Sequence, residues 1–290
     1  MMRSLLFIPA DSPQKLAKGL GSGADALLLD LEDSISLERK EAAREGALDF
    51  LAAHRDKTER PKLIVRINSF ASGFADDDLN AIVPGRPDAV MFPKAEGGAS
   101  VIHLDAKLTA REAVHGLTEG AIKVVAIATE TAKALFLAGT YADASHRLIG
   151  LTWGAEDLSA ELGADRNRDD AGNFLDPYRL ARSLCLAGAV AAQVQPIDTV
   201  YVDFRNAEGL ARECEEARRD GFTGKMAIHP NQVEAINRAF TPTEEALSQA
   251  QAVIDAFARE PGAGVVGIGG KMFDRPHLVK AQALLARVGR

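Results

Sequence analysis

The sequence predicts an α/β protein built as a (β/α)₈ TIM barrel with a C-terminal helical extension. Two observations lead to this prediction. Short apolar runs alternate with helical patterns eight times, and the runs are almost continuously apolar, as is typical of parallel strands buried on both faces. Eight such units favour closure of a parallel sheet into a barrel. We assign residues 1–240 to the barrel domain and residues 241–290 to a lid-like helical extension.

The expected strands are the eight apolar runs Ser4–Pro9, Ala24–Asp30, Lys62–Ile67, Ala89–Pro93, Lys123–Ala128, Arg147–Trp153, Thr199–Asp203 and Lys225–His229. The helices expected between them are Pro13–Leu20, Leu37–Arg55, Asp76–Ile82, Ala99–Leu108, Ala132–Tyr141, Tyr178–Ala192 and Ala207–Asp220. A doubly wound open sheet is the structural alternative. It usually carries a G-x-G-x-x-G turn after its first strand, whereas the first strand here is followed by the segment Pro9–Pro13.

The remaining C-terminal residues continue in helical patterns, which predict helices over Gln232–Phe240, Thr243–Arg259 and His277–Val288. A glycine-rich stretch from Pro261 to Gly270 separates the last two. We expect this stretch to be flexible, and the extension to act as a lid, because regions of low local stability are suited to closure over a site.

The composition excludes several classes of protein. Of the 290 residues, 47% are apolar and 26% are charged, as in ordinary globular proteins. A net charge of −7 without a basic block argues against nucleic-acid binding. The N-terminal apolar run is too short for a signal peptide, and no run approaches the ~20 residues of a membrane span. Cys185 and Cys214 are too few for a disulfide framework and are expected to be buried thiols, so we expect a cytoplasmic protein without membrane contact.

Charged or ionisable residues follow seven of the eight predicted strands. Barrel enzymes place their chemistry at the C-terminal ends of the strands, so we expect these residues to converge on one mouth. They are, in chain order, Asp30, Glu32 and Asp33, then Arg66, Lys94, Glu130, Asp157, Asp203 with Arg205, and His229.

Glu130 and Asp157 are the best candidates for metal ligands, because each follows an apolar strand closely. Carboxylate oxygens suit Mg²⁺, Mn²⁺ or Ca²⁺ rather than zinc. Mg²⁺ often takes only one or two protein carboxylates and leaves its other positions to water and substrate. The alternative interpretation is that each acid stabilises the N-terminus of the helix that follows it.

The remaining residues at the predicted mouth each have two interpretations. Arg66 either grips a substrate carboxylate with two hydrogen bonds or pairs with Glu32 or Asp33 inside the mouth. Lys94 either neutralises a phosphate or pairs with an acid. His229 is either a general base or a packed ring with satisfied nitrogens.

The chain also resembles a known family, the citrate lyase β-subunit-like or HpcH/HpaI aldolase family of the phosphoenolpyruvate/pyruvate barrel superfamily. The resemblance covers essentially the whole chain in order. It rests on Arg3–Pro9, Leu29–Ser34 with Lys40 and Arg44, Val65–Asn68, Met91–Lys94, Ala128–Thr131, Gly154–Leu158, Gly221–Lys225, Ile228–Gln232 and Gly270–Pro276. In this chain the fifth strand ends Ala-Thr-Glu-Thr, where Ile-Glu-Thr is commoner in the family.

The resemblance implies a Mg²⁺-dependent lyase that acts on coenzyme A (CoA) thioesters of small β-hydroxy di- or tricarboxylic acids. Such enzymes cleave citryl-, malyl- or citramalyl-CoA to acetyl-CoA, or a homologue, and a 2-oxo acid. The resemblance also implies a homotrimer or homohexamer. Two alternatives stay open: a thioester hydrolase of the same fold, and the β subunit of a citrate lyase complex, which works on a thioester of an acyl carrier protein.

The resemblance also assigns roles to residues. Glu130 and Asp157 become the metal ligands, and Arg66 becomes the clamp on the oxo-acid carboxylate. Asp274, in the tail, becomes the acid/base that reaches into the mouth of a neighbouring subunit. Glu32 and Asp33 become the groups that hold metal-bound water, and Lys94 stays a candidate substrate-binding residue. The CoA phosphates need cations, for which the candidates near the mouth are Lys15, Lys18, Lys40 and Lys94.

Overall fold

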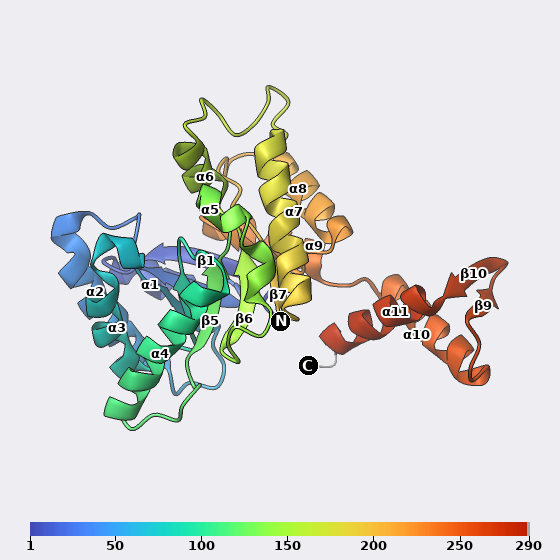
Figure 1. The fold of residues 1–290 in the computed structure, drawn as a ribbon, viewed down its shortest axis with the longest axis horizontal. Helices are drawn as coiled ribbons and strands as arrows, with labels where there is room; N and C mark the ends of the chain where they lie inside the picture. Colours follow the sequence, from blue (N-terminus) through green and yellow to red (C-terminus); the bar gives the residue numbers. More distant parts are fainter. Residues whose placement is uncertain (289–290) are drawn as a thin grey trace. The chain divides into compact units, whose positions relative to one another are not determined.

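The computed structural model describes residues 1–288 and divides the chain into two compact units. The larger unit is Met2–Arg238, and the smaller one comprises Met1 and the residues from Ala239 onward. Figure 1 shows the larger unit with its helices wrapped around a central sheet, and the smaller unit as a helical hairpin that ends in a short β-hairpin.

The larger unit is a closed barrel of eight strands in sequential order, with every neighbouring pair parallel. This architecture confirms the predicted (β/α)₈ fold. The first and last strands pair with each other, so the sheet has no free edge. The strands are β1 (Ser4–Pro9), β2 (Ala26–Asp30), β3 (Lys62–Arg66), β4 (Ala89–Phe92), β5 (Lys123–Ile127), β6 (Leu148–Thr152), β7 (Gln195–Asp198) and β8 (Gly224–Ala227).

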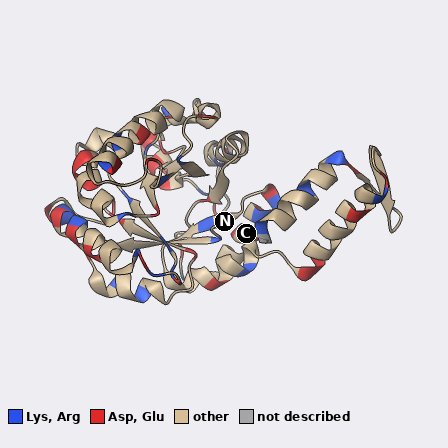
Figure 2. Cartoon of the chain, turned by 90° about the horizontal axis from the view of Figure 1, so that it is seen from below, with Lys and Arg blue, Asp and Glu red and all other residues tan. Residues whose placement is uncertain are grey.

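Helices follow the strands and cover the outside of the barrel. The α-helices are α1 (Pro13–Leu20), α2 (Lys40–His54), α3 (Ala75–Ile82), α4 (Gly98–Val114), α5 (Ala132–Leu135), α6 (Ala155–Leu162), α7 (Asp176–Ala191), α8 (Ala207–Asp220) and α9 (Val233–Phe240). Short 3₁₀ helices are η1 (Leu37–Arg39), η2 (Phe70–Ser72), η3 (Val83–Gly85), η4 (Ala138–Tyr141) and η5 (Pro230–Gln232). Figure 2 shows acidic and basic residues interspersed along the outer helices.

A single cluster of apolar side chains from the strands forms a packed core of the barrel unit. Its members include Leu5, Leu28, Ile64, Met91, Val125, Ile127, Ile197 and Met226, all less than 5% exposed. Because a barrel of this kind has a filled interior, its chemistry has to lie at the mouth formed by the loops after the strands.

The prediction for the seventh strand is wrong. It placed the strand at Thr199–Asp203, whereas β7 is Gln195–Asp198, and Asp203 and Arg205 lie exposed in the loop beyond it. The apolar pattern failed because the true strand ends in a buried carboxylate. Asp198 accepts hydrogen bonds from Lys225 at 2.8 Å and from the Trp153 indole at 2.8 Å, so this charge is neutralised inside the barrel wall.

Other elements near the site also differ from the predictions. The helix α6 was not predicted, and α4 extends to Val114, six residues beyond its predicted end. The last barrel strand stops at Ala227, and His229 caps the following 3₁₀ helix instead, where its Nδ1 accepts from the Asn231 N–H.

The smaller unit contains α10 (Glu244–Arg259), α11 (Arg275–Val288) and the antiparallel strands β9 (Val265–Ile268) and β10 (Lys271–Asp274). Its own core includes Val253, Phe257, Val266 and Ala281. The predicted flexible stretch is therefore largely a β-hairpin. Gly269 and Gly270 form its two-residue turn with φ of 56° and 76°, values that glycine adopts without strain.

Two further expectations concern cysteines and membranes. Cys185 and Cys214 are both free thiols in the buried interior, as predicted. None of the helices within residues 1–288 is long and apolar enough to cross a membrane.

Candidate active site

The two predicted metal ligands meet at the C-terminal mouth of the barrel, around one lysine. Glu130 follows β5 and is 3% exposed, and Asp157 lies in the first turn of α6, directly after β6. The Lys94 N–H donates to Glu130 Oε2 at 2.5 Å, and Lys94 Nζ lies 3.1 Å from Asp157 Oδ1. The two acids, 27 positions apart in the sequence, therefore face the same small volume.

The alternative role, stabilising the N-terminus of the following helix, fits Asp157 but not Glu130. Asp157 lies in the first turn of α6, where a negative charge interacts favourably with the helix dipole. Glu130 does not cap α5, because that role belongs to Thr131, whose hydroxyl accepts from the Ala134 N–H.

Lys94 connects the ends of four strands. It follows β4, and its ammonium also donates to Glu32 Oε1, beyond β2, at 2.8 Å. Its backbone has φ of 50°, in the left-handed region that non-glycine residues rarely adopt. Strained backbone of this kind is concentrated at functional sites, where surrounding contacts hold it in place.

Arg66, the last residue of β3, is held by three carboxylates. Its Nε and Nη2 donate to the two oxygens of Asp30 at 2.7 Å each. Its Nη1 lies 3.0 Å from Glu32 and 3.1 Å from Asp33. Phe7, from β1, supports the guanidinium with its ring centroid 4.8 Å away. In this structure Arg66 therefore pairs with acids inside the mouth, as the second interpretation predicted. Asp30 occupies the edge of the guanidinium formed by Nε and Nη2, which donate in parallel.

Glu32 and Asp33 differ in their exposure although they are adjacent. The Glu32 side chain is 7% exposed, and its Oε2 forms no hydrogen bond of good geometry within the described residues despite its ion pair with Arg66. The Asp33 side chain is 53% exposed and forms an ion pair with Arg66. Asp33 is thus the charge that an incoming anion displaces most easily from Arg66.

The loop that carries Glu32 and Asp33 is fixed by a buried lysine. Lys40, at the start of α2, donates from Nζ to the backbone carbonyls of Leu31 and Glu32 at 2.7 Å each and to Asn68 Oδ1 at 2.8 Å. All three ammonium protons are used, so Lys40 is not free to bind a CoA phosphate. Lys15 and Lys18 remain exposed on α1.

A buried carboxylate on α3 fixes Asn68, the side chain that Lys40 contacts. Asp78, fully buried on α3, accepts from both the backbone and the side-chain amide of Asn68 at 2.7 Å and from Arg44 Nε at 2.8 Å. The sequence analysis missed the roles of Asp30, Lys40 and Asn68. These three residues lie within the segments that resemble the family, and this was the one sign of their importance. The resemblance did not indicate which groups they contact.

Burial and crowding of like charges shape the electrostatics of the mouth. Burial, together with the charge of Asp157, raises the pKa of Glu130 to about 8. Burial is also the largest influence on Glu32, where it outweighs Arg66 and Lys94 and raises the pKa of the carboxyl. Burial lowers the pKa of the Lys94 ammonium, but Glu32, Glu130 and Asp157 together outweigh it, so the pKa is raised overall.

Gly154 explains how Glu130 fits against β6. A Cβ atom at position 154 would lie 2.7 Å from Glu130 Cγ and 3.1 Å from its Oε1, closer than side-chain atoms normally approach. The glycine lets the backbone before α6 pass directly beside the glutamate. Its role is therefore to give Glu130 room.

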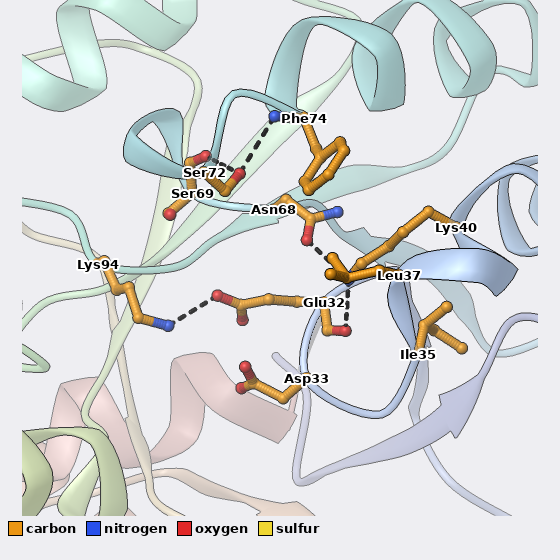
Figure 3. A pocket seen from close by; sticks show the side chains of 10 residues that line it. All are labelled: Glu32, Asp33, Ile35, Leu37, Lys40, Asn68, Ser69, Ser72, Phe74 and Lys94. Atoms are coloured by element: carbon orange, nitrogen blue, oxygen red, sulfur yellow. Dashed lines mark hydrogen bonds and ion pairs between the residues drawn. The ribbon is translucent and has the colours of Figure 1, made fainter.

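A pocket of about 310 Å³ opens beside these charges. Figure 3 shows Lys94 and Glu32 pointing toward each other in it, with Ser69 and Phe74 from the loop after β3 near its other side. Its lining residues are Glu32, Asp33, Ile35, Leu37, Lys40, Asn68, Ser69, Ser72, Phe74 and Lys94.

The donor set fits a hard divalent cation that keeps open positions. Within residues 1–288, no three His, Cys, Asp or Glu side chains are grouped closely enough to enclose a metal ion. Glu130 and Asp157 together could offer two oxygen ligands, the number that Mg²⁺ sites that also bind water and substrate typically take from the protein. Burial and the neighbouring charge of Asp157 raise the pKa of Glu130, and a cation bound between the two acids would oppose that effect.

Asp274 and His229 are two predicted site residues that do not join the cluster around Lys94. Asp274 ends β10 in the smaller unit, where His277 Nδ1 lies 2.5 Å from its Oδ1 and holds the pKa of the carboxyl below its usual value. His229 stacks on Phe204 with ring centroids 4.9 Å apart, in agreement with the packed interpretation.

The fold and the mouth define a (β/α)₈ enzyme with an acidic, arginine-containing site suited to a small anionic substrate. Comparison with known proteins places it further: residues 3–230 match the family model described as HpcH/HpaI aldolase/citrate lyase. The chain belongs to this family and is a lyase of the citryl-CoA lyase-like type.

Named relatives agree with the family. The chain is 34% identical to the citrate lyase subunit beta of Haemophilus influenzae, with 99% of this chain and 97% of the relative covered. It is 32% identical to the mitochondrial citramalyl-CoA lyase of Rattus norvegicus, with 98% and 85% covered. The crystal structure of CitE from Mycobacterium tuberculosis, solved with magnesium, acetoacetate and coenzyme A, superposes with a TM-score of 0.79 at 34% identity and covers 99% of this chain and 98% of that one.

Proposed function

We propose that the protein is a Mg²⁺-dependent carbon–carbon lyase. Its substrate is a β-hydroxyacyl-CoA thioester of the citryl-, malyl- or citramalyl-CoA type, and its products are a 2-oxo acid and acetyl-CoA or a homologue. The observation that carries the proposal is the meeting of Glu130 and Asp157 around Lys94, with Arg66 in the same mouth. The magnesium, acetoacetate and coenzyme A bound by the structural relative support it.

Glu130 and Asp157 are the residues that would hold the metal. When bound, Mg²⁺ supplies a Lewis acid that lowers the pKa of a coordinated hydroxyl and polarises the carbonyl that forms from it. The buried position of Glu130 keeps bulk water away from this side of the mouth, which strengthens electrostatic interactions there.

The other residues at the mouth orient the substrate and handle protons. Arg66 presents Nη1 to the carboxylate of the acid, which contributes mainly by orientation. Cleavage removes the hydroxyl proton, and the electron pair of the broken carbon–carbon bond moves to the α-carbon of the thioester, which then takes up a proton. Glu32 and Asp33 hold water beside the metal position and provide a route for the departing proton.

Asp274 is proposed as the acid/base that serves the mouth of a neighbouring copy, with the residues from 241 onward acting as a lid. This role needs a homotrimer or homohexamer. The position of Asp274 at the end of a β-hairpin supports the proposal, because its side chain is 43% exposed and pairs with His277.

The decisive experiment is a panel of citryl-, malyl- and citramalyl-CoA assayed with and without Mg²⁺. We expect release of a 2-oxo acid with stoichiometric acetyl-CoA or homologue, only when a divalent metal is present. A hydroxy acid together with free CoA would instead identify a thioester hydrolase. Activity confined to thioesters of an acyl carrier protein, with co-purifying partners, would identify a citrate lyase β subunit.

Variants assign the roles within this reaction. Glu130→Gln and Asp157→Asn are expected to weaken Mg²⁺ binding in calorimetric titrations. Asp274→Asn is expected to keep metal binding but lose about 10²–10⁴-fold in turnover, the usual contribution of general acid–base catalysis. Glu156→Gln is the matched control, since Glu156 neighbours Asp157 but contacts Asn167 instead of the mouth. Full activity of the first two variants without metal contradicts the ligand assignment.

A further inference from the structure

The positive charge of Lys94 lies where the proposed metal site concentrates negative charge. We propose that the Lys94 ammonium is a built-in counter-ion that stands in for the metal at Asp157 and is displaced from it when a divalent cation binds. This inference rests on the metal site of the proposed function. In this inference Lys94 keeps its ion pair with Glu32 and releases the one with Asp157.

The geometry of the mouth carries this inference. Three carboxylates from different strand ends surround Lys94: Glu32 after β2, Glu130 after β5 and Asp157 after β6. The ammonium contacts Glu32 and Asp157 at 2.8 and 3.1 Å. It therefore neutralises one of the two carboxylates that the proposal assigns to the metal.

The contacts of Lys94 separate a fixed part from a movable part. Its backbone N–H is bound to Glu130, and its left-handed backbone is held by the loop, so the main chain is anchored. Its side chain and that of Asp157 are each 31% exposed, whereas that of Glu32 is 7% exposed. A lysine stem is flexible and its ammonium is a point charge, so the contact with Asp157 is the one that can be released.

Charge repulsion makes the release necessary. A divalent cation bound to Asp157 would lie close to the ammonium, and like charges at such distances repel strongly in a partly buried site. The ammonium therefore keeps its buried partner Glu32 and turns toward the pocket of about 310 Å³ that it already lines. Figure 3 shows this pocket bounded by Lys94, Glu32 and Ser69. Metal binding thus frees a cation for the anionic end of the substrate.

The test measures metal affinity without substrate. Mg²⁺ and Mn²⁺ are titrated calorimetrically into metal-free wild type, Lys94→Met and Lys94→Arg. We expect Lys94→Met to bind both metals about tenfold more tightly, because the competing charge is gone, and Lys94→Arg to stay close to wild type. Lys133→Met is the matched control: Lys133 pairs with Glu96 at 2.6 Å on an exposed surface, and its loss is expected to leave metal affinity unchanged.

Equal or weaker metal binding by a folded Lys94→Met overturns the inference, since a lysine that merely positions Asp157 gives that result. Folding is checked by circular dichroism and thermal unfolding. A second measurement follows the Lys94 ¹⁵Nζ resonance of the wild type by NMR, and the resonance is assigned by its absence from the Lys94→Arg spectrum. This resonance should shift when Mg²⁺ is added, and an unmoved resonance contradicts the displacement. A wild type that binds neither metal removes the metal site and this inference together. Tighter binding by Lys94→Met, together with no oxo-acid release by the wild type, supports the inference and removes the lyase.

Discussion

The two ends of the barrel use the same kinds of charged residue with opposite results. At the N-terminal end, Arg147 is fully buried and donates through two nitrogens to Glu112, at 2.6 and 2.8 Å, and through a third to Asp105. The remaining capacity of Glu112 is filled by the N–H groups of Gly120 and Ile122, both at 2.9 Å. This network is complete without any ligand.

At the C-terminal end the charges are incompletely matched. Glu130 has a raised pKa, Glu32 leaves one oxygen without a hydrogen bond in the described part of the chain, and Lys94 is shared among several acids. The comparison shows that a closed network stabilises the fold, whereas an excess of carboxylates at the mouth creates a demand for a cation.

The largest expected effect is on stability at the N-terminal end. Arg147→Met leaves Glu112 buried without its charged partner, so we expect the free energy of unfolding to fall by about 3–5 kcal/mol in urea denaturation. The control Lys133→Met removes an exposed pair and is expected to cost no more than about 1 kcal/mol. Similar losses in both variants would mean that the buried network does not differ from a surface ion pair.

A smaller effect is expected at the mouth, on ligand binding instead of stability. Gly154→Ala places a methyl group 2.7 Å from Glu130 Cγ, so the glutamate has to shift, and we expect Mg²⁺ affinity to fall about tenfold. Gly139→Ala is the control, because a Cβ at that position meets no heavy atom within 4 Å in the described structure. Calorimetric Mg²⁺ titration measures both. Unchanged affinity in Gly154→Ala would show that the fit around Glu130 is not needed.

The smallest effect is a pH dependence that belongs to the N-terminal network. Burial raises the pKa of Glu112, but its hydrogen bonds from Arg147 and the backbone outweigh burial and lower the pKa below its ordinary value of 4.5. Its stabilising contribution is therefore present above about pH 4.5 and is lost as the pH falls through the lowered folded-state pKa. We expect a slope of at most about 1.4 kcal/mol per pH unit from this group, measured by urea unfolding between pH 6 and pH 3.

The variant Arg147→Met tests the assignment of that slope. Without the guanidinium, the pKa of Glu112 loses the largest of the influences that lower it, so the stability of the variant is expected to fall less steeply with acid. An equally steep fall would place the acid sensitivity in other carboxylates, such as Asp88, whose pKa is lowered by Arg60 and by the Leu63 N–H against the effect of burial.

The barrel was predictable because its periodic signal is local. Runs such as Ser4–Pro9 are apolar after their first residue, and helices such as Pro13–Leu20 and Ala207–Asp220 begin and end where the pattern does. Once the barrel closes, the convergence of Glu130 and Asp157 follows from their positions after neighbouring strands. That part of the site is a consequence of topology.

Other features depend on side chains that meet only after folding. The strand β7 was misplaced because Asp198 is buried against Lys225, a pairing that no local pattern reveals. The burial of Lys40 beneath the loop of Glu32 is of the same kind, since a lysine in a helical pattern is normally solvated. The chemical roles of the mouth residues remain predictions from the resemblance until the variants are measured.

The grip of Asp30 on Arg66 has a consequence for selectivity. Two of the three guanidinium nitrogens are committed to Asp30, so under the proposed function an arriving acid group would be tethered at a single nitrogen and could rotate about it. A contact through one nitrogen selects for a negatively charged group but does not discriminate between acids of different shape. Discrimination between a hydrogen, a methyl and a carboxymethyl substituent then falls to the pocket wall, where Ser69 and Phe74 offer contrasting surfaces.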